Sequence, residues 1–149
     1  MATLTATLTE SITLNGSLRG STNSVTITGI NDVFERIVTC TTAQTTTVAV
    51  FDTFPYSSAG AIDVDRSKYV RVTNLDDTAV IELAVVTTAT NYQVTLTAGQ
   101  SHILCKGSEV VLGEADVTPS FGTMEDLTSL QVKPVGAESP RIEVFVGVE

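Results

Sequence analysis

The single histidine and the two cysteines are the first residues to test for chemistry, because these side chains often act as bases, nucleophiles or metal ligands. His102 and Cys105 are three residues apart in the run S-H-I-L-C. Residues three apart on a strand point to opposite faces, so this pair does not suit a nucleophile–base dyad. Structural zinc needs four Cys or His ligands, and the chain has three such residues. We therefore expect no catalytic, cofactor-binding or metal-binding residue, and no enzyme activity.

Two short acidic clusters were considered as calcium ligands. Asp63 and Asp65 alternate on one segment, and Asp76-Asp77 lies in a predicted turn. Calcium takes six to eight oxygen ligands, and neither cluster has the spacing of an EF-hand loop. We interpret both as solvated turn acids. The triplet Asn15-Gly16-Ser17 matches a glycosylation site, but no secretory signal is visible before it, so we interpret it as a hairpin turn.

Composition and charge exclude two classes of partner. The net charge is −9, and the eight basic residues are scattered along the chain. Nucleic-acid binding needs a concentrated basic surface that displaces counterions from phosphates, so no nucleic-acid partner is expected. No apolar run reaches 18 residues, so no membrane partner is expected either. Cys40 and Cys105 lie in alternating apolar segments, and we expect them to be reduced and to serve as small core residues.

Period-two alternation of apolar and polar residues recurs along the whole chain. Threonine fills about one position in six, and this β-branched residue favours strands. The runs indicate about ten short strands at residues 2–9 continued by 11–14, and at 24–28, 33–42, 46–54, 68–73, 79–86, 92–97, 101–105, 110–112, 127–135 and 141–148. Residues 123–130 contain the only plausible helical turn. This pattern predicts an all-β fold, an antiparallel β-sandwich of jelly-roll or Ig-like type, formed as a single domain by residues 1–149.

The predicted core consists of inward positions on the later strands. It contains Val70, Val72, Ile81, Leu83, Val85, Leu96, Ile103, Val144 and Val146.

The first twenty residues form an unusually regular segment. Four threonines alternate with Leu4, Ala6 and Leu8, which gives one hydroxyl face and one narrow apolar face. Residues 1–20 are therefore predicted to be an extended N-terminal arm that adds a strand to a neighbouring subunit. The alternative is an ordinary edge strand that packs Leu4 and Leu8 on its own sandwich.

Several segments resemble small β-sandwich virion proteins of tailed bacteriophages. They are the run Y-V-R-V-T-N-L-D-D from Tyr69 to Asp77, the strand V-I-E-L-A-V from Val80, and the turn L-T-A-G-Q-S from Leu96. The opening T-L-N-G-S-L-R-G-S-T from Thr13 and the final strand pair, from Asp126 and from Arg141, resemble the same proteins.

The resemblance implies a capsid decoration (cement) protein of a tailed phage. Such a protein would bind the outside of the major capsid protein as a homotrimer, be assembled in the host cytoplasm, and reside on the capsid surface of the virion. One alternative places it in the neck, the tail or a fibre attachment. An alternative from another class is a carbohydrate-binding β-sandwich module, which needs exposed aromatic rings; Tyr56 and Tyr92 are the candidates.

Overall fold

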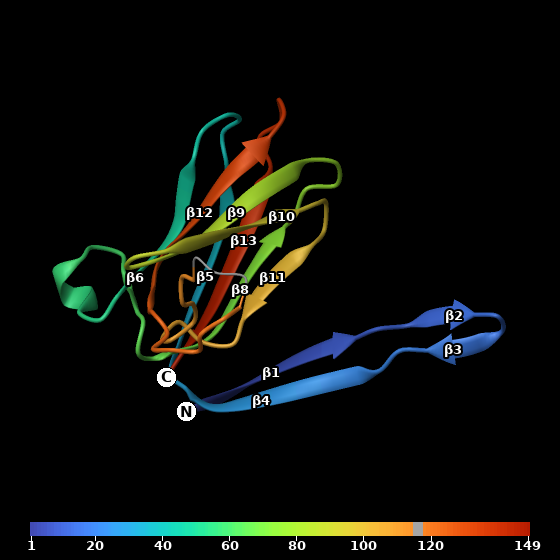
Figure 1. Cartoon of the computed structure of the whole chain (residues 1–149), viewed down its shortest axis with the longest axis horizontal. Coiled ribbons are helices and arrows are strands. Elements are labelled where there is room, and N and C mark those ends of the chain that lie inside the picture. Colours follow the sequence, from blue (N-terminus) through green and yellow to red (C-terminus); the bar gives the residue numbers. More distant parts are fainter. Residues whose placement is uncertain (115–117) are drawn as a thin grey trace.

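A β-sandwich body and a long N-terminal hairpin make up the molecule (Figure 1). The computed structural model describes residues 1–114 and 118–149. The described elements are β1 (Ala2–Thr9), β2 (Ile12–Leu14), β3 (Ser17–Arg19), β4 (Thr22–Ile30), β5 (Asp32–Thr39), β6 (Thr46–Asp52), η1 (Pro55–Ser57), β7 (Ile62–Asp63), β8 (Ser67–Asn74), β9 (Val80–Thr87), β10 (Asn91–Leu96), β11 (Ser101–Leu104), β12 (Leu127–Val135) and β13 (Arg141–Val148).

Two packed sheets form the body. One has the strand order β10-β9-β12-β6-β7 and the other the order β11-β8-β13-β5. All pairings are antiparallel except β6 with β7, which is parallel. The all-β sandwich expected from the alternation is confirmed. The structure adds two strands to the predicted ones, β3 in the N-terminal hairpin and β7 inside a predicted loop.

The core lies between the two sheets and contains most of the residues expected there. Of the nine predicted core residues, eight are buried: Val70, Val72, Ile81, Leu83, Val85, Leu96, Val144 and Val146. The prediction was wrong for Ile103, whose side chain is 47% exposed. In β11 the inward positions are His102 and Leu104, so Ile103 faces away from the core beside Arg71.

Cys40 and Cys105 are free thiols in different environments. Cys40 is fully buried in the core, as expected. Cys105 is exposed, so its predicted core position was wrong. It follows β11 at the same parity as Ile103 and therefore also lies on the outward side of the sheet.

Residues 123–130 do not form the helical turn that the sequence allowed. The described chain instead enters β12 at Leu127, whose side chain is buried together with Leu130. β12 is a central strand that pairs with both β9 and β6, and this ladder satisfies the backbone of the segment. Before it, Val111 and Glu125 form an isolated bridge, which is all that the predicted strand at 110–112 becomes.

A buried asparagine fixes the turn between β8 and β9. The amide nitrogen of Asn74 donates hydrogen bonds to the carbonyl oxygens of Ala79 at 2.8 Å and Leu96 at 3.2 Å, and its amide oxygen accepts one from the N–H of Asp76 at 3.1 Å. Asp76 in turn accepts the N–H of Thr78 at 3.0 Å and that of Ala79 at 2.8 Å. These bonds explain the N-L-D sequence, since a buried amide must have its partners supplied.

Truncation of a core side chain should destabilise the body far more than truncation of Ile103. We expect Leu83→Ala to lower the free energy of unfolding by about 2–5 kcal/mol, because it leaves a cavity between the sheets. Ile103→Ala is the matched control, and its loss should be clearly smaller. Urea denaturation of both variants measures the difference. Equal losses would contradict the outward placement of Ile103.

Candidate functional site

The N-terminal hairpin is the most prominent feature outside the body, and we call residues 3–28 the arm. The same antiparallel register runs through two separate ladders, from Thr3–Thr28 to Thr9–Thr22 and from Ile12–Arg19 to Leu14–Ser17. Asn15 and Gly16 close it with positive φ angles of 50° and 78°, as in a type I′ turn. The predicted arm ended at residue 20. In the structure the chain folds back after the turn, and β4 forms the second strand of the hairpin.

The two faces of the arm differ sharply in chemistry. The hydroxyl face carries ten threonine or serine side chains and one aliphatic side chain, Leu18: Thr3, Thr5, Thr7, Thr9, Ser11, Thr13, Thr22, Ser24, Thr26 and Thr28 share it by register. Two cross-strand pairs are hydrogen-bonded, Thr7–Ser24 at 2.9 Å and Thr9–Thr22 at 3.3 Å. The other face, which we call the apolar face, carries Leu4, Ala6, Leu8, Ile12, Leu14, Val25 and Ile27, together with Asn23, Arg19 and Ser17.

Only the root of the arm packs on the body. A side chain on Gly147 of β13 would meet Leu4 Cδ2 at 3.2 Å and Ile30 Cδ1 at 3.5 Å, so both residues lie directly over this glycine. Ile30 is buried, and the N–H of Asn31 donates to the carbonyl of Val148 at 2.9 Å. Leu8, in contrast, is 57% exposed. Of the two alternatives for this segment, own-body packing therefore applies to Leu4 and not to Leu8.

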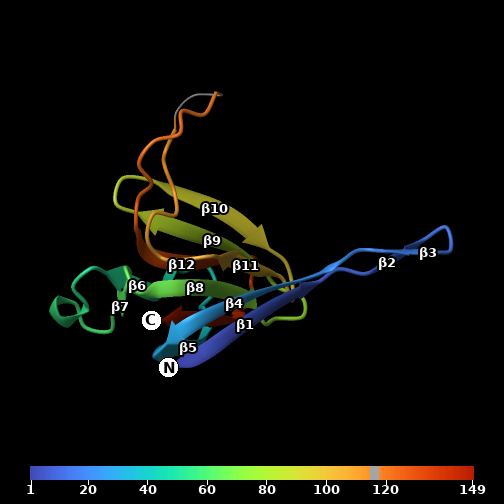
Figure 2. The same ribbon diagram turned by 90° about the horizontal axis from the view of Figure 1, so that it is seen from below.

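Beyond its root, the arm extends past the edge of the body (Figure 2). We call residues 12–19 the arm tip. Its three aliphatic side chains are exposed to 60% at Ile12, 53% at Leu14 and 75% at Leu18. Ile12 and Leu14 belong to the apolar face, whereas Leu18 belongs to the hydroxyl face. The tip therefore exposes aliphatic side chains on both faces, with Arg19 opposite Ile12, Ser17 opposite Leu14 and Thr13 opposite Leu18.

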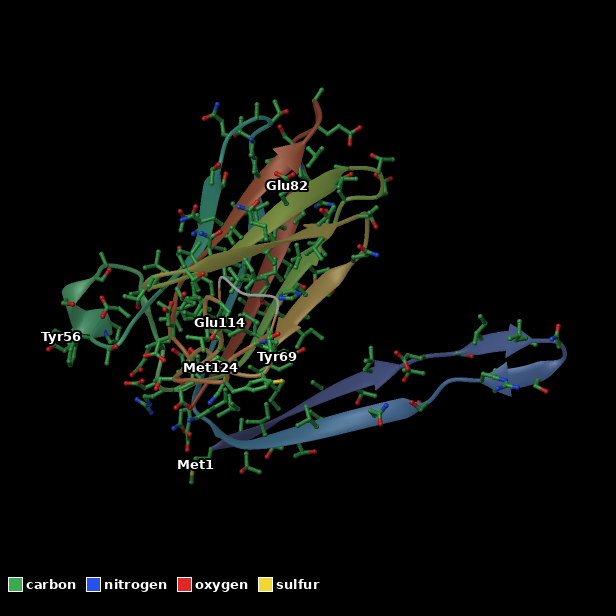
Figure 3. All side chains as sticks on the ribbon, in the orientation of Figure 1. Met1, Tyr56, Tyr69, Glu82, Glu114 and Met124 are labelled. Atoms are coloured by element: carbon green, nitrogen blue, oxygen red, sulfur yellow. The ribbon has the colours of Figure 1, made fainter. Side chains whose placement is uncertain are left out.

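A groove of about 850 Å³ separates the apolar face of the arm from the outward side of the sheet β11-β8-β13-β5. From the arm it is lined by Ala6, Thr7, Leu8, Asn23, Ser24, Val25 and Ile27, and from the body by Lys68, Tyr69, Arg71, Ser101, Ile103, Cys105 and Lys106. Tyr69 marks the side of the body that faces the arm (Figure 3). The groove thus has two walls with apolar side chains, one from each part of the molecule.

The charged lining of the groove is basic, although the protein as a whole is acidic. Lys68, Arg71 and Lys106 line it, and no carboxylate is among its described lining residues. Each base also has a glutamate partner: Lys68–Glu149 at 3.1 Å, Arg71–Glu143 at 2.7 Å and Lys106–Glu109 at 2.7 Å. Positive charge therefore faces the cavity, and the paired carboxylates lie outside its lining.

Arg71 is held rigidly on the floor of the groove. Its guanidinium lies 5.9 Å from the centre of the Phe145 ring, and Phe145 meets Tyr69 edge-on at 6.1 Å. Arg71 also donates to the hydroxyl of Thr73. A guanidinium fixed by an ion pair, an aromatic ring and a hydroxyl loses little further freedom when a ligand binds beside it.

The structure places His102 beside Tyr92 and not beside a nucleophile. The Tyr92 hydroxyl and His102 Nε2 are 2.7 Å apart, and the rings meet edge-on. This bond joins β10 of one sheet to β11 of the other. Burial raises the pKa of Tyr92 and lowers the pKa of His102. The pair therefore connects the two sheets, and Tyr92 is not the exposed ring that a sugar platform needs.

Tyr56 is exposed, and its ring neighbour is Phe54 at 5.9 Å. This pair lies in the loop around η1, on the side of the body away from the arm tip (Figure 3). The sequence interpretation paired Tyr56 with Tyr92 and missed Phe54, whose spacing of two residues from Tyr56 was the available signal.

The acidic clusters cap turns. Asp63 accepts the N–H groups of Asp65 at 3.1 Å and Arg66 at 3.3 Å. The N–H groups of Ala79 and Thr78 lower the pKa of Asp76. Within residues 1–114 and 118–149, no group of three or more His, Cys, Asp or Glu side chains could hold a metal ion. In the same ranges, no helix is long and apolar enough to cross a membrane.

Comparisons with protein-family models, with curated proteins and with solved structures found no significant match to the chain.

The burial of His102 beside Tyr92 should make the protein sensitive to mild acid, because burial disfavours the charged imidazolium. The pKa of His102 lies below the ordinary value of 6.5 in the folded chain, so the unfolded chain takes up the proton first. The contribution of neutral His102 to the free energy of unfolding should be fully present above about pH 6.5 and should decline as the pH falls below that value. We expect the melting temperature to drop between pH 7.5 and pH 5.5.

The matched variant is His102→Asn, whose amide accepts a hydrogen bond from Tyr92 and does not titrate. It should show a smaller drop over the same range. Parallel melting curves for the two proteins would refute the role of His102.

Proposed function

We propose that this protein is a structural protein of a tailed-phage particle, and specifically a capsid decoration protein that binds the outside of the major capsid protein. The observation that carries the proposal is the arm, whose distal half carries exposed aliphatic side chains and receives no support from its own body. The sequence resemblance to virion proteins names the kind of particle.

The energetics of the arm support a binding role. A two-stranded hairpin alone is at best marginally stable in water. The body completes its own core without the arm tip, so the tip contributes nothing to that core. An exposed, uncharged strand edge is also an aggregation hazard unless a partner covers it. A partner surface that covers Ile12, Leu14 and Leu18 would stabilise the hairpin and would also shield its exposed edge from aggregation.

The distribution of charge also supports an assembly protein. The arm contains one acidic residue, Glu10, and one basic residue, Arg19. The rest of the chain therefore carries the whole net charge of −9. Like charges keep the bodies apart in solution, whereas the neutral arm approaches a partner without this repulsion. Such a protein attaches by its arm and exposes its acidic body.

The number of copies per particle tests the position in the virion. We expect hundreds of copies in purified particles, measured as the band intensity relative to that of the major capsid protein. About a dozen or fewer copies would move the protein to the neck, the tail or a fibre attachment. Its absence from purified particles would overturn the proposal.

One observation favours a second candidate, a carbohydrate-binding module. Phe54 and Tyr56 form an exposed aromatic pair, and such pairs stack on sugar rings. The titration of a glycan panel against the wild type and Tyr56→Ala tests this candidate. Glycan binding that depends on Tyr56, together with absence from particles, would replace the virion proposal.

Polar substitution of the arm tip should abolish attachment without unfolding the protein. We expect the double variant Leu14→Thr, Leu18→Thr to keep the melting temperature within a few degrees, because neither side chain packs on the body. The same variant should lose at least tenfold in binding to particles that lack the protein. Co-sedimentation with such particles measures the binding.

The matched control is Ile37→Thr, Val135→Thr, which replaces two exposed aliphatic side chains on the body. This control should bind as the wild type does. Equal binding by both double variants would show that the arm tip is not the attachment element.

A further inference from the structure

We propose that the groove binds a fatty acid, a ligand with a carboxylate head on a single alkyl chain. The inference goes beyond the proposed function, because the described lining of the groove and the arm tip have no residue in common. Three features of the lining support it: the apolar walls, neutral polar side chains that are already hydrogen-bonded, and a pair of adjacent lysines.

The groove has the size and the apolar walls of a small-molecule site. Its volume of about 850 Å³ lies within the roughly 300–1,000 Å³ of typical ligand sites, which are lined mainly by apolar side chains. Leu8 and Val25 line it from the arm and Ile103 lines it from the body, and each of these side chains is about half exposed. An alkyl chain between the two walls would remove all three from water, and this burial favours binding.

The serine, threonine and asparagine side chains of the lining already have hydrogen-bond partners within the protein. These pairs are Thr7–Ser24 at 2.9 Å, Ser101–Thr73 at 2.7 Å and Asn23–Ser21 at 3.0 Å. A sugar or an extended peptide would find few free partners here, and its own buried hydroxyl or amide groups would stay unpaired at a cost in free energy. A methylene chain needs no such partners, so the lining favours an alkyl ligand.

Lys68 and Lys106 lie side by side in the lining and form the site for the carboxylate head. The N–H of Gly107 donates to the carbonyl oxygen of Ser67 at 3.0 Å, which continues the antiparallel register of β8 and β11 and places Lys106 beside Lys68. Two adjacent ammonium groups repel each other, and an anion between them relieves this repulsion. A chain with a positive head would add to it, so the sign of the head decides binding.

The ion pairs of the two lysines leave room for a ligand. Lys68–Glu149 and Lys106–Glu109 are exposed pairs, and such pairs contribute little to stability. An ammonium group also has three N–H donors, so each lysine can share its donors between its glutamate and a bound carboxylate.

Arg71 adds a third positive charge to the lining, three residues along β8 from Lys68. Glu143 and Thr73 each contact one nitrogen of its guanidinium. A guanidinium has five N–H donors, so donors remain for a ligand. No carboxylate is among the described lining residues, and charges more than about 8 Å away are largely screened at physiological ionic strength. The acidic remainder of the body therefore does not exclude an anion from the groove.

Dodecanoate, kept below its micelle concentration, tests the site in the full-length protein. Calorimetric titration should detect binding, and the affinity should rise by up to about fourfold per methylene from octanoate through decanoate to dodecanoate. Cys105 lines the groove and is exposed, so its alkylation by iodoacetamide reports occupancy, whereas Cys40 is buried. Dodecanoate at about ten times its dissociation constant should slow this reaction about tenfold, because only the free protein reacts.

Dodecylammonium has the same chain with the opposite charge, and it should neither bind as tightly nor protect Cys105. An absence of dodecanoate binding, unchanged alkylation of Cys105, or equal binding of dodecylammonium would overturn the inference.

Two pairs of variants locate the head and the chain. Lys68→Gln, Lys106→Gln should weaken dodecanoate binding about tenfold. Its control, Arg36→Gln, Lys133→Gln, removes the same charge from exposed residues outside the lining and should bind as the wild type does. Equal binding by the two double variants would overturn the assignment of the head.

Leu8→Asp places a carboxylate in the apolar wall and should also weaken binding about tenfold, whereas Thr5→Asp adds the same charge to the hydroxyl face and should not. Leu8 is exposed, so this variant should fold even if the lysine variant does not. Equal binding by these two variants would place the ligand elsewhere and overturn the inference. None of the four variants changes the arm tip, so attachment to particles remains a separate measurement of the proposed function.

Discussion

The contact of Leu4 and Ile30 over Gly147 is the constraint on which the shape of this protein depends. It holds the root of a two-stranded arm whose strands pair with each other and not with the body. Gly147 permits this close approach because it has no side chain, and a larger residue would push the root away from β13. Everything beyond the root follows from the hairpin, whose two ladders share one register: the arm leaves the body, the groove opens beneath it, and the tip reaches past the edge.

The arm and the body are stabilised by different interactions. The body buries a contiguous hydrophobic core between two sheets, and the hydrogen bonds of the buried Asn74 side chain fix the turn between β8 and β9. The arm has no core; it has a ladder, a tight Asn15-Gly16 turn and a row of hydroxyl pairs. Such a ribbon gains little from burial. Its threonines keep it extended and uncharged, and its aliphatic residues are placed where a partner can cover them.

Electrostatics gives the two parts complementary roles. The body carries the net negative charge, and this charge disfavours non-specific contact between copies. The groove is the exception, since Lys68, Arg71 and Lys106 face it from the body wall.

The sequence alone determined the fold class, the strands of the body and eight of nine core residues, because period-two alternation reports directly which face of a strand is buried. It also determined the Asn15-Gly16 turn and the two faces of the arm. Only the tertiary structure decided where the arm ends, since the partner of β1 is a long-range choice and Ser24–Thr28 could equally have joined a body sheet. It alone decided that Ile103 and Cys105 face the groove, because β11 is an edge strand and both of its faces carry apolar residues. The groove itself has no local signal in the sequence, since it exists between two elements whose separation is set by one glycine more than a hundred residues from the arm.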